Sequence, residues 1–419
     1  MTSASKRKPI LVIGGGIAGL TSALEAAETG AEVALVEKSA SLGGRVAAFN
    51  QYFPKLCPPS CGLEINFRRL KNNRRISVFT QAEVESISGV PGDYEAVVQI
   101  APRYVTGACT LCGACEKVCP AEVPDEFNWG RSQSKAVHLP FATAYPALYK
   151  VERSACPAGC HACVDACAYA AIDLNQAPEK KTLQVASVVV ATGWEPYDAT
   201  KLDNLGYGKH ANVVTNVVLE RLAAPDGPSG GSIVRPSDGK KPGSVAFVQC
   251  AGSRDQNHLA YCSGVCCSAS LKQATYIRSR DPEAQITMFY IDVRTPGHLE
   301  EFGAKTVSEA GVELIKGKVG KVEEDAATGD LLVTVEDVLH GARTTRRYQL
   351  VVLATGMVPR TRGLPAGIAT DEFGFVTNAN AGIYGAGCAK RPAEVSASVR
   401  DATGAALKAL QIAVGATHG

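Results

Sequence analysis

The stretch Ile10-Leu-Val-Ile13-Gly14-Gly-Gly16-Ile-Ala-Gly19 lies close to the start of the chain and decides its fold. Four apolar residues predict a short buried strand, and the spaced glycines after them predict a tight turn into a helix over residues 20–29. A second apolar run, residues 33–36, predicts the next strand and is followed at once by the acidic Glu37. This order of strand, glycine turn, helix, strand and acid is typical of a dinucleotide-binding unit.

Each position of this motif has a physical role in holding a dinucleotide. Gly14 permits the tight turn, Gly16 lets the backbone approach a pyrophosphate, and Gly19 allows the helix to pack closely on the strand. The pyrophosphate is expected at the helix N-terminus, and Glu37 is expected to accept hydrogen bonds from an adenosine ribose. A glycine-rich turn without a ligand is the alternative, but it does not account for the strand and the acid that follow.

FAD is favoured over NAD because a second glycine pair follows in Leu42-Gly43-Gly44-Arg45. Two buried strands with an Ala-Thr-Gly ending, residues 188–193 and 351–356, and the late segment Gly382 to Cys388 are also similar to two-dinucleotide-domain flavoproteins. The expected FAD contacts are Gly14, Gly16, Gly19, Glu37, Lys38, Gly44, Arg45, Val84, Thr192, Gly193, Gly356, Gly387 and Cys388.

The late segment differs from these flavoproteins in one residue. Cys388 stands where they carry an aspartate that contacts the ribityl chain, so we expect the backbone amides of Gly387 and Cys388 to bind instead. A helix over residues 395–413 follows, and we expect its N-terminus to stabilise negative charge on a reduced flavin ring.

Two cysteine runs interrupt the flavoprotein pattern. The first has the ferredoxin spacing C-x2-C-x2-C-x3-C-P, and the second departs from it through an extra residue between Cys156 and Cys160 and through Ala168 in place of proline. In the crossed ligation of two-cluster ferredoxins, one [4Fe-4S] cluster takes Cys109, Cys112, Cys115 and Cys167, and a second takes Cys119, Cys156, Cys160 and Cys163. Structural zinc sites are the alternative reading of the runs, and a lost or remodelled second cluster is the alternative for the Cys156 half.

A further cysteine pair, Cys57 and Cys61, lies near the expected FAD site. It could be a redox-active disulfide, a ligand pair for another metal, or two buried thiols. Glutathione-reductase-type enzymes place their pair directly after the glycine pair and four residues apart, which differs from the arrangement here.

The cysteine runs lie between two expected paired strands, residues 94–100 and 182–190, so we interpret them as an insertion. The predicted fold class is α/β, a two-dinucleotide-domain flavoprotein similar to thioredoxin and glutathione reductases, with an inserted ferredoxin-like iron-sulfur domain. The expected segments are residues 1–100 (FAD-binding domain, first part), 101–182 (insert), 183–242 (FAD-binding domain continued, and linker), 243–345 (nicotinamide-domain-like fold without the glycine motif) and 346–419 (FAD-binding domain, last part).

The second dinucleotide-type domain is expected to begin with a strand over residues 244–249, which is followed by Cys250-Ala-Gly-Ser-Arg-Asp255 and not by a glycine motif. Direct oxidation of NAD(P)H is therefore not expected. For Cys262, Cys266 and Cys267 we favour a structural or docking role over metal ligation.

Composition limits the function classes. Of the 419 residues, 46% are apolar and 20% charged, with a net charge of +2, so nucleic acid is not expected as a partner. The start of the chain leads directly into a strand, and no apolar run is long enough for a membrane span, so neither a secretory leader nor a membrane protein is expected. Fifteen cysteines in a chain that is expected to have no secretory leader indicate a reducing compartment, and the cytoplasm is the expected location.

The chain resembles the flavin-bearing A-type component of heterodisulfide reductase, and within that family the shorter bacterial form found in the heterodisulfide-reductase-like complexes of sulfur oxidisers. The resemblance covers nearly the whole chain, and its carriers include Cys109 to Pro120, Glu122-Val-Pro-Asp-Glu-Phe127, Gln249 to Asp255 and Tyr261 to Cys267. It implies FAD, iron-sulfur clusters, a homodimer, and B-type and C-type partner subunits that carry out the sulfur chemistry. Longer archaeal members have an additional N-terminal domain and a C-terminal ferredoxin domain without counterparts in these 419 residues.

These observations together predict an oxidoreductase subunit that passes electrons between FAD and [4Fe-4S] clusters during sulfur-compound oxidation. One alternative is an NAD(P)H-dependent disulfide reductase that uses Cys57 and Cys61. Another is a docking scaffold whose flavin is structural.

Overall fold

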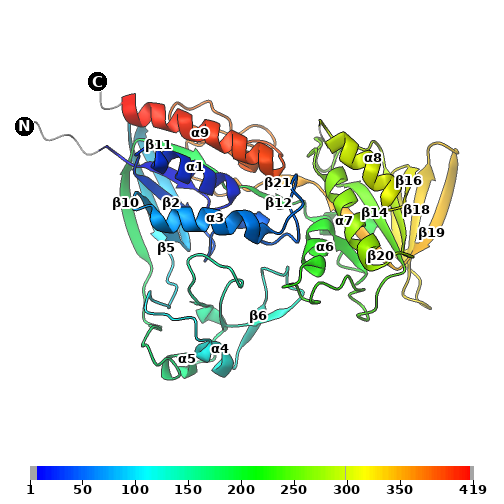
Figure 1. Cartoon of the computed structure of the whole chain (residues 1–419), viewed down its shortest axis with the longest axis horizontal. Coiled ribbons are helices and arrows are strands. Elements are labelled where there is room, and N and C mark those ends of the chain that lie inside the picture. Colours follow the sequence, from blue (N-terminus) through cyan, green and yellow to red (C-terminus); the bar gives the residue numbers. More distant parts are fainter. Residues whose placement is uncertain (1–6, 298, 416–419) are drawn as a thin grey trace, which may run out of the picture.

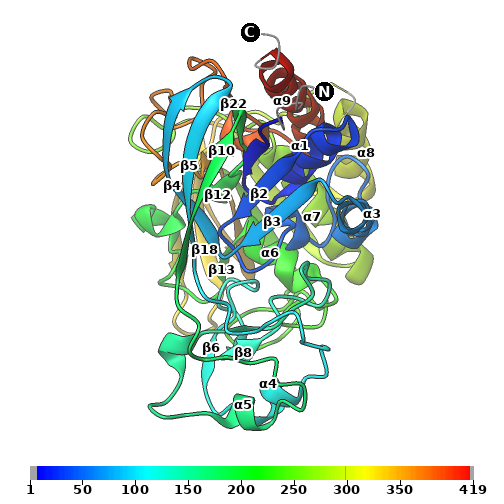
Figure 2. The ribbon, with the colours of Figure 1, turned by 90° about the vertical axis from the view of Figure 1, so that its left-hand side faces the viewer.

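The computed structural model describes residues 7–297 and 299–415 of the chain, so the first six residues of the expected leaderless start lie outside it. Two α/β lobes lie side by side, and the cysteine-bearing segment extends below the first lobe (Figure 1). In a view turned by 90°, this segment lies at the opposite end of the molecule from helices α1 (Ile17–Glu28) and α9 (Val395–Gly415) (Figure 2).

The first lobe is built on a five-stranded parallel sheet of strand order β22-β11-β1-β2-β3. Its strands are β1 (Ile10–Ile13), β2 (Val33–Glu37), β3 (Ile76–Thr80), β11 (Ser187–Val190) and β22 (Ile383–Gly385). Its helices are α1 (Ile17–Glu28), the one-turn α2 (Gly44–Ala47), α3 (Pro59–Asn72) and α9 (Val395–Gly415), with the 3-10 turn η4 (Gly387–Ala389) before α9. Strands from near both ends of the chain, β1 and β22, lie in this one sheet, so the sheet is complete only when both ends of the chain have folded.

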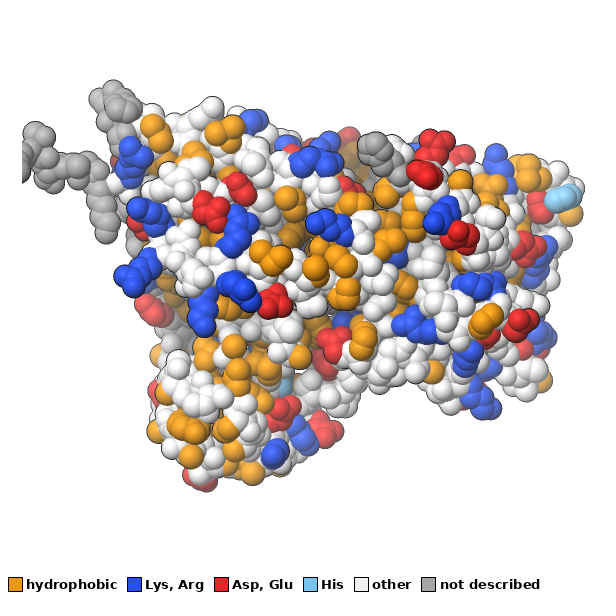
Figure 3. Space-filling model, in the orientation of Figure 1, with side chains coloured by type: hydrophobic (Ala, Val, Ile, Leu, Met, Phe, Trp, Pro, Cys, Tyr) orange, Lys and Arg blue, Asp and Glu red, His pale blue; other side chains and the backbone are white. Residues whose placement is uncertain are grey.

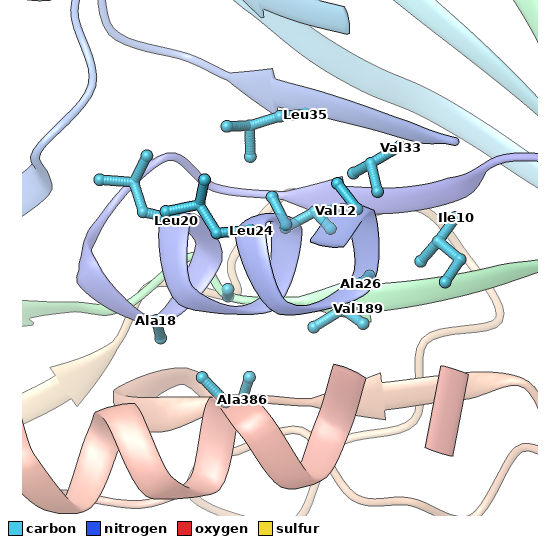
Figure 4. Packing of buried hydrophobic residues seen from close by; sticks show 14 of the residues in the cluster. Ile10, Val12, Ala18, Leu20, Leu24, Ala26, Val33, Leu35, Val189 and Ala386 are labelled. Carbon is cyan, nitrogen blue, oxygen red and sulfur yellow. The ribbon is translucent and has the colours of Figure 1, made fainter. Parts of the chain in front are cut away.

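The core of the first lobe explains why α1 packs where it does. Leu20 and Leu24 of α1 are fully buried and point toward Val12 and Leu35 of the sheet, while Ala18 lies near Ala386 at the end of β22 (Figure 4). Truncation of one such leucine to alanine costs a core about 2–5 kcal/mol. Because these apolar side chains of α1 pack on the sheet, they hold the N-terminus of the helix, and the glycine turn before it, in place.

The cysteine-bearing segment leaves the first lobe from a three-stranded antiparallel sheet. This sheet contains β4 (Ala82–Val90), β5 (Asp93–Ile100) and β10 (Glu179–Val185), in the order β10-β5-β4. We call residues 101–178, which lie between β5 and β10, the insert. The single strand expected over residues 182–190 is wrong, because the run divides between β10, which is largely exposed, and the fully buried β11 of the parallel sheet.

The insert contains short elements only. Its strands are β6 (Glu122–Pro124), β7 (Gln133–Lys135), β8 (Val137–His138) and β9 (Lys150–Val151), and its helical turns are α4 (Ala114–Val118), η1 (Arg153–Ala155) and α5 (Ala162–Asp165). Its small core includes Cys115, Cys119 and Cys163, so sulfur atoms take places that apolar side chains fill elsewhere.

The second lobe has a five-stranded parallel sheet of order β13-β20-β14-β15-β16 and an antiparallel meander, β17-β18-β19. The parallel strands are β13 (Val213–Thr215), β14 (Ser244–Ala251), β15 (Gln285–Tyr290), β16 (Val312–Lys316) and β20 (Leu350–Thr355). The meander comprises β17 (Val319–Glu324), β18 (Leu331–Asp337) and β19 (Ala342–Tyr348), and the helices are α6 (Asn216–Ala223), α7 (Cys266–Arg280) and α8 (Leu299–Glu309), with η2 (Ala199–Lys201) and η3 (Asp203–Leu205). The antiparallel pair β12 (Trp194–Pro196) and β21 (Met357–Pro359) runs between the lobes.

Two of the expected domain boundaries are wrong. Strand β13 and helix α6 were assigned to the FAD-binding domain and its linker, and β20 to the last FAD-binding segment, but all three belong to the second lobe. The cause is that the two strands with an Ala-Thr-Gly ending lie in different sheets, β11 in the first and β20 in the second. The chain thus crosses between the lobes directly after each of these strands.

None of the helices in residues 7–297 and 299–415 is both long and apolar enough to cross a lipid bilayer.

Candidate cofactor and cluster sites

The glycine loop, residues Gly14 to Gly19, makes close backbone contacts that no larger residue would allow. A Cβ on Gly19 would lie 1.7 Å from the Gly14 carbonyl oxygen, which is the close helix-on-strand packing that the motif predicts. Gly14 has a φ of +107°, and a Cβ there would lie 2.4 Å from the Ala191 carbonyl oxygen at the end of β11. The loop therefore lies directly against the strand that ends in Thr192 and Gly193.

The second glycine pair joins the same place. Gly16 and Gly43 form a parallel bridge, the Gly43 amide donates to the Gly15 carbonyl at 2.8 Å, and a Cβ on Gly44 would lie 2.8 Å from the Gly16 Cα. The two glycine segments, predicted separately as phosphate-side elements, are thus in contact.

The acidic residue at the end of β2 is buried beside this loop. The Glu37 carboxylate accepts the Gly15 amide at 2.5 Å and the Ser39 amide at 2.7 Å, so it orders the turn. Each oxygen keeps acceptor capacity for a ribose hydroxyl. Lys38 is exposed and pairs with Glu83 at 3.0 Å, which brings it next to Val84, although the Val84 side chain is buried in the core.

Thr192 and Arg45 line the other side of the loop. The Thr192 hydroxyl is buried and has no hydrogen-bond partner among the described residues, as expected of a group that awaits a ligand. The Arg45 Nε donates to the Trp194 carbonyl at 3.2 Å, and the guanidinium lies 4.6 Å from the centre of the Trp129 ring. Burial, with Arg360 nearby, lowers the pKa of Arg45 to about 10.

The expectation for Gly387 and Cys388 is wrong in part. Gly387 reaches the glycine loop, since a Cβ on it would lie 2.8 Å from the Ala18 Cβ, but its amide donates to Asp401 of α9 at 2.9 Å. The buried Cys388 thiol faces the Ala393 carbonyl at 3.3 Å, and burial raises the pKa of that thiol. A carboxylate from the following helix therefore occupies the Gly387 amide that was expected to bind the flavin.

The N-terminus of α9 is also not a free cationic end. The carboxylate of Glu394 accepts the amides of Ser396 at 2.5 Å and Ala397 at 2.6 Å. A carboxylate at this position satisfies the first-turn donors and offsets the helix dipole. The role expected for this helix end is therefore already filled by a side chain of the protein.

Gly356 lies elsewhere. It follows β20 in the second lobe, where a Cβ would lie 2.2 Å from the Ser253 Oγ, and it is not part of the glycine loop assembly. The remaining predicted residues fit FAD on this geometry: two glycine segments in contact, a buried acid beside them, and a buried hydroxyl without a partner among the described residues.

Four cysteines of the insert surround a first cavity between α4 and the segment after α5. They are Cys109, Cys112, Cys115 and Cys167, the set predicted from crossed ferredoxin ligation. Val105 bridges to Ile172 and closes the cavity, and Tyr149 lies in its wall and donates to Glu116 at 3.0 Å.

A second cavity is lined by Cys119, Cys156, Cys160 and Cys163. The extra residue between Cys156 and Cys160 is taken up by a turn, in which the Cys160 amide donates to the Pro157 carbonyl at 3.1 Å and Gly159 has a φ of +70°. The altered spacing therefore leaves Cys160 in the cavity wall.

The spacing of the thiols in these cavities can be compared with what a single ion and a cluster require. No three Cys, His, Asp or Glu side chains in residues 7–297 and 299–415 converge closely enough to hold a single ion. A cubane cluster keeps its thiolates further apart, because each binds a different iron. Burial raises the pKa of Cys115 to about 11, and burial also raises that of Cys163, so the positive charge of bound iron is what would stabilise them as thiolates.

Cys57 and Cys61 lie at the start of α3, the first just before the helix and the second in its first turn. Burial, together with both cysteines, raises the pKa of Tyr52 to about 12, so the two thiols flank one phenol. Cys61 is exposed.

The structure brings together a third group of thiols that the sequence did not reveal. Cys250 of β14 lies close to Cys262, Cys266 and Cys267 around the start of α7. Burial raises the pKa of the Cys250, Cys266 and Cys267 thiols, and neighbouring thiols raise it further. Buried polar atoms of Gln249 nearby have no partner among the described residues. The sequence contains a signal for this group, because Cys250 together with Cys262, Cys266 and Cys267 gives four cysteines. The structure thus places Cys250 beside the three later thiols, for which the sequence favoured a structural or docking role over metal ligation.

Comparison with known proteins fits this geometry. A family model for FAD dependent oxidoreductases matches residues 9–54, which contain both glycine segments. The second A-type iron-sulfur component of the CoB–CoM heterodisulfide reductase of Methanopyrus kandleri is 39% identical over 95% of this chain, and the A-type component from Methanocaldococcus jannaschii is 38% identical over 95%. The chain is thus similar, over 95% of its own length, to A-type subunits of heterodisulfide reductases. It spans 63% of the length of each of these two relatives.

Solved structures show the same fold at low sequence identity. The thioredoxin reductase of T. acidophilum matches with a TM-score of 0.54 and 15% identity, covering 98% of this chain and all of that one. The thioredoxin reductase of Lactococcus lactis matches with a TM-score of 0.54 and 14% identity, also covering 98% of this chain and all of that one. The chain therefore has the two-dinucleotide-domain fold of these reductases, and it carries a cysteine-rich insert.

Proposed function

We propose that the chain is an oxidoreductase subunit that binds FAD and two [4Fe-4S] clusters and passes electrons between them. FAD would supply the exchange between one-electron and two-electron chemistry. The glycine loop with Gly43 and Gly44 would bind its pyrophosphate, Glu37 its ribose, and the eight cysteines of the insert the two clusters.

The observation that carries this proposal is the sorting of the cysteines. Each cavity takes three cysteines from one run and one from the other, as crossed ligation of two cubanes requires. Two unrelated zinc sites would give no reason for the exchange of Cys119 and Cys167 between runs.

The test is the iron, sulfide and flavin content of anaerobically purified protein, with its EPR spectrum. About eight irons per chain are expected from the two cavities, and about twelve if the third thiol group also holds a cubane. Cys266→Ala would separate these, because it should remove about four irons only in the second case. Content of about four irons would contradict the second cavity, and a protein without flavin would contradict the FAD site.

Partners follow from the family and from the surface. We propose B-type and C-type heterodisulfide-reductase-like subunits as partners, a homodimer, cytoplasmic location and a role in sulfur-compound oxidation, all supported by the resemblance to the short bacterial form. Apolar side chains gather on the face of the insert (Figure 3), where Leu111, Val118 and Tyr169 are 41%, 45% and 55% exposed. Leu111 lies between Cys109 and Cys112 in the sequence, and Tyr169 lies in the wall of the first cavity. A partner that docks on this apolar face would therefore be placed to exchange electrons with the first cavity. Co-purification with the partner subunits, reduced by charge substitution of Leu111, tests the assignment.

The alternative with a specific observation is a disulfide reductase that uses Cys57 and Cys61, since both thiols lie beside Tyr52. Reduction of the flavin by NADH or NADPH alone in stopped flow would support it. A scaffold with a structural flavin would show a flavin that stays oxidised while the clusters are reduced.

A further inference from the structure

One hairpin of the insert reaches away from the cysteines to the junction of the two lobes. Strands β6 and β7 form it, and β6 begins three residues after Cys119 of the second cavity. Its tip, residues 125–132, is ordered by hydrogen bonds between its own residues. The Asn128 side-chain amide donates to Asp125 at 2.7 Å and to Ser132 at 3.0 Å. The tip is thus a short, ordered extension of the second cavity wall.

The second lobe holds this tip with a buried arginine. Arg221 of α6 is 1% exposed, donates from Nε to the Asn128 side-chain oxygen at 2.8 Å, and lies 4.4 Å from the centre of the Phe127 ring. Its other donors reach Asp226 at 3.0 Å and the Ala48 carbonyl of the first lobe at 3.4 Å. One guanidinium therefore contacts all three parts of the molecule.

The first lobe holds the next residue of the same tip. Trp129 has a φ of 57°, in the left-handed region that bulky residues rarely adopt. Its ring lies under the guanidinium of Arg45, the residue directly after the second glycine pair. Two arginines from two lobes thus hold two aromatic side chains of one hairpin.

The residue before Arg221 fixes the lobes to each other. Glu220 and Lys272 form an ion pair of 3.0 Å with side chains 3% and 5% exposed, and the Lys272 Nζ donates to the Gln51 carbonyl of the first lobe at 2.6 Å. The Glu220 carboxylate also accepts the Asn50 amide at 3.1 Å. Adjacent residues of α6 therefore bind different parts of the molecule, one the first lobe and the other mainly the insert.

We propose that Arg221 and Trp129 are positioning residues that hold the second cavity at a fixed place relative to the FAD site and so set the rate of electron transfer between the two. The proposal rests on the proposed function for its redox readout. In each transfer one electron leaves a reduced cluster in the insert and is taken up by the oxidised flavin, with no bond made or broken. Since neither residue lies in a cavity wall, their loss should change the rate and leave the centres themselves intact.

The test compares Arg221→Met with Arg280→Met in the full chain. Arg280 of α7, which is exposed, is the control for the loss of an arginine within one lobe. It also donates to backbone carbonyls, those of Gly231, Ala223 and Tyr276, but all of them lie in the second lobe. Each protein is assayed for iron and flavin content, for midpoint potentials, for hydrogen–deuterium exchange of residues 122–135, and for flavin reduction after a photochemical one-electron reductant is generated.

We expect Arg221→Met to keep its cofactors and potentials, to exchange residues 122–135 about tenfold faster or more through the loss of a charged hydrogen bond, and to reduce its flavin several-fold more slowly. The Trp129→Leu variant should show the same slowing, and Trp129→Phe, which keeps an aromatic face under Arg45, should restore the rate. Unchanged exchange and rate in Arg221→Met, or equal effects of Arg280→Met, would overturn the proposal. Wild-type protein without iron or flavin would refute the proposed function, whereas the exchange of residues 122–135 would still decide whether the junction exists.

Discussion

The crossed arrangement of the cysteines can be tested by pairing alanine substitutions. Cys115 and Cys119 lie in the same sequence run but line different cavities, whereas Cys115 and Cys167 lie in different runs but line the same cavity. Single substitutions do not separate crossed from uncrossed ligation, because either model loses one cluster. Double substitutions separate the two models, because the loss of iron shows whether the two cysteines bind the same cluster or different clusters.

The size of the effect follows from the ligand count. Each cavity has four cysteines, so removal of one leaves three, and removal of a second from the same cavity affects no further cluster. Cys115→Ala with Cys167→Ala should therefore lower the iron content by about four per chain, and Cys115→Ala with Cys119→Ala by about eight. Any cluster held by the third thiol group adds equally to every variant and cancels in the difference.

The assay is iron and acid-labile sulfide per chain after anaerobic purification, with EPR of the dithionite-reduced protein. Cys57→Ala, whose thiol lies in neither cavity, controls for the loss of a cysteine elsewhere. If the pair from one run loses about four irons and the pair from two runs about eight, ligation is uncrossed and the geometric assignment is refuted.

Three further predictions concern stability and the flavin. Lys272→Met leaves Glu220 buried without its cation and should lower the free energy of unfolding in a urea titration by about 3–5 kcal/mol, against less than about 1 kcal/mol for the exposed Lys305→Met; equal losses would contradict a role for burial. Burial, with Lys150 nearby, lowers the pKa of His138, so the folded protein binds this proton less readily than the unfolded chain, and its melting temperature should fall as pH drops below about 6.5, less so in His138→Gln. Glu394→Gln removes the carboxylate that caps α9 and should raise the flavin midpoint potential by the equivalent of about 0.3–1 kcal/mol, and an unchanged potential in a redox titration would show that this helix end does not act on the flavin.

Local patterns in the sequence were sufficient where the structure is local. The glycine loop, the strand before it and the acid after it are contiguous, and the geometry of Gly14 and Gly19 follows from contacts within that unit and with β11. The ferredoxin pattern likewise predicted which four cysteines line each cavity, because the exchange of the fourth cysteine between two runs is part of that pattern.

Patterns failed where a residue's partner is distant in sequence. The Ala-Thr-Gly strand over residues 351–356 looks like its counterpart over residues 188–193, and only the pairing of β20 with β13 and β14 assigns it to the second lobe. The amide of Gly387 was expected to be free, but Asp401 reaches back to it from α9. Neither contact leaves a trace in local hydrophobic periodicity.

The carboxyl end of the second sheet shows what such distant contacts can change. In this fold class that edge binds a nicotinamide dinucleotide, whose pyrophosphate needs a glycine turn and the free amides of a helix N-terminus. Here Cys250, the last residue but one of β14, has a φ of 55°, and α7 begins with Cys266 and Cys267. The Cys266 thiol lies 3.5 Å from the Thr355 carbonyl at the end of β20, so sulfur lies at this edge of the sheet. The edge of the second lobe at which a nicotinamide dinucleotide would bind is therefore lined by thiols.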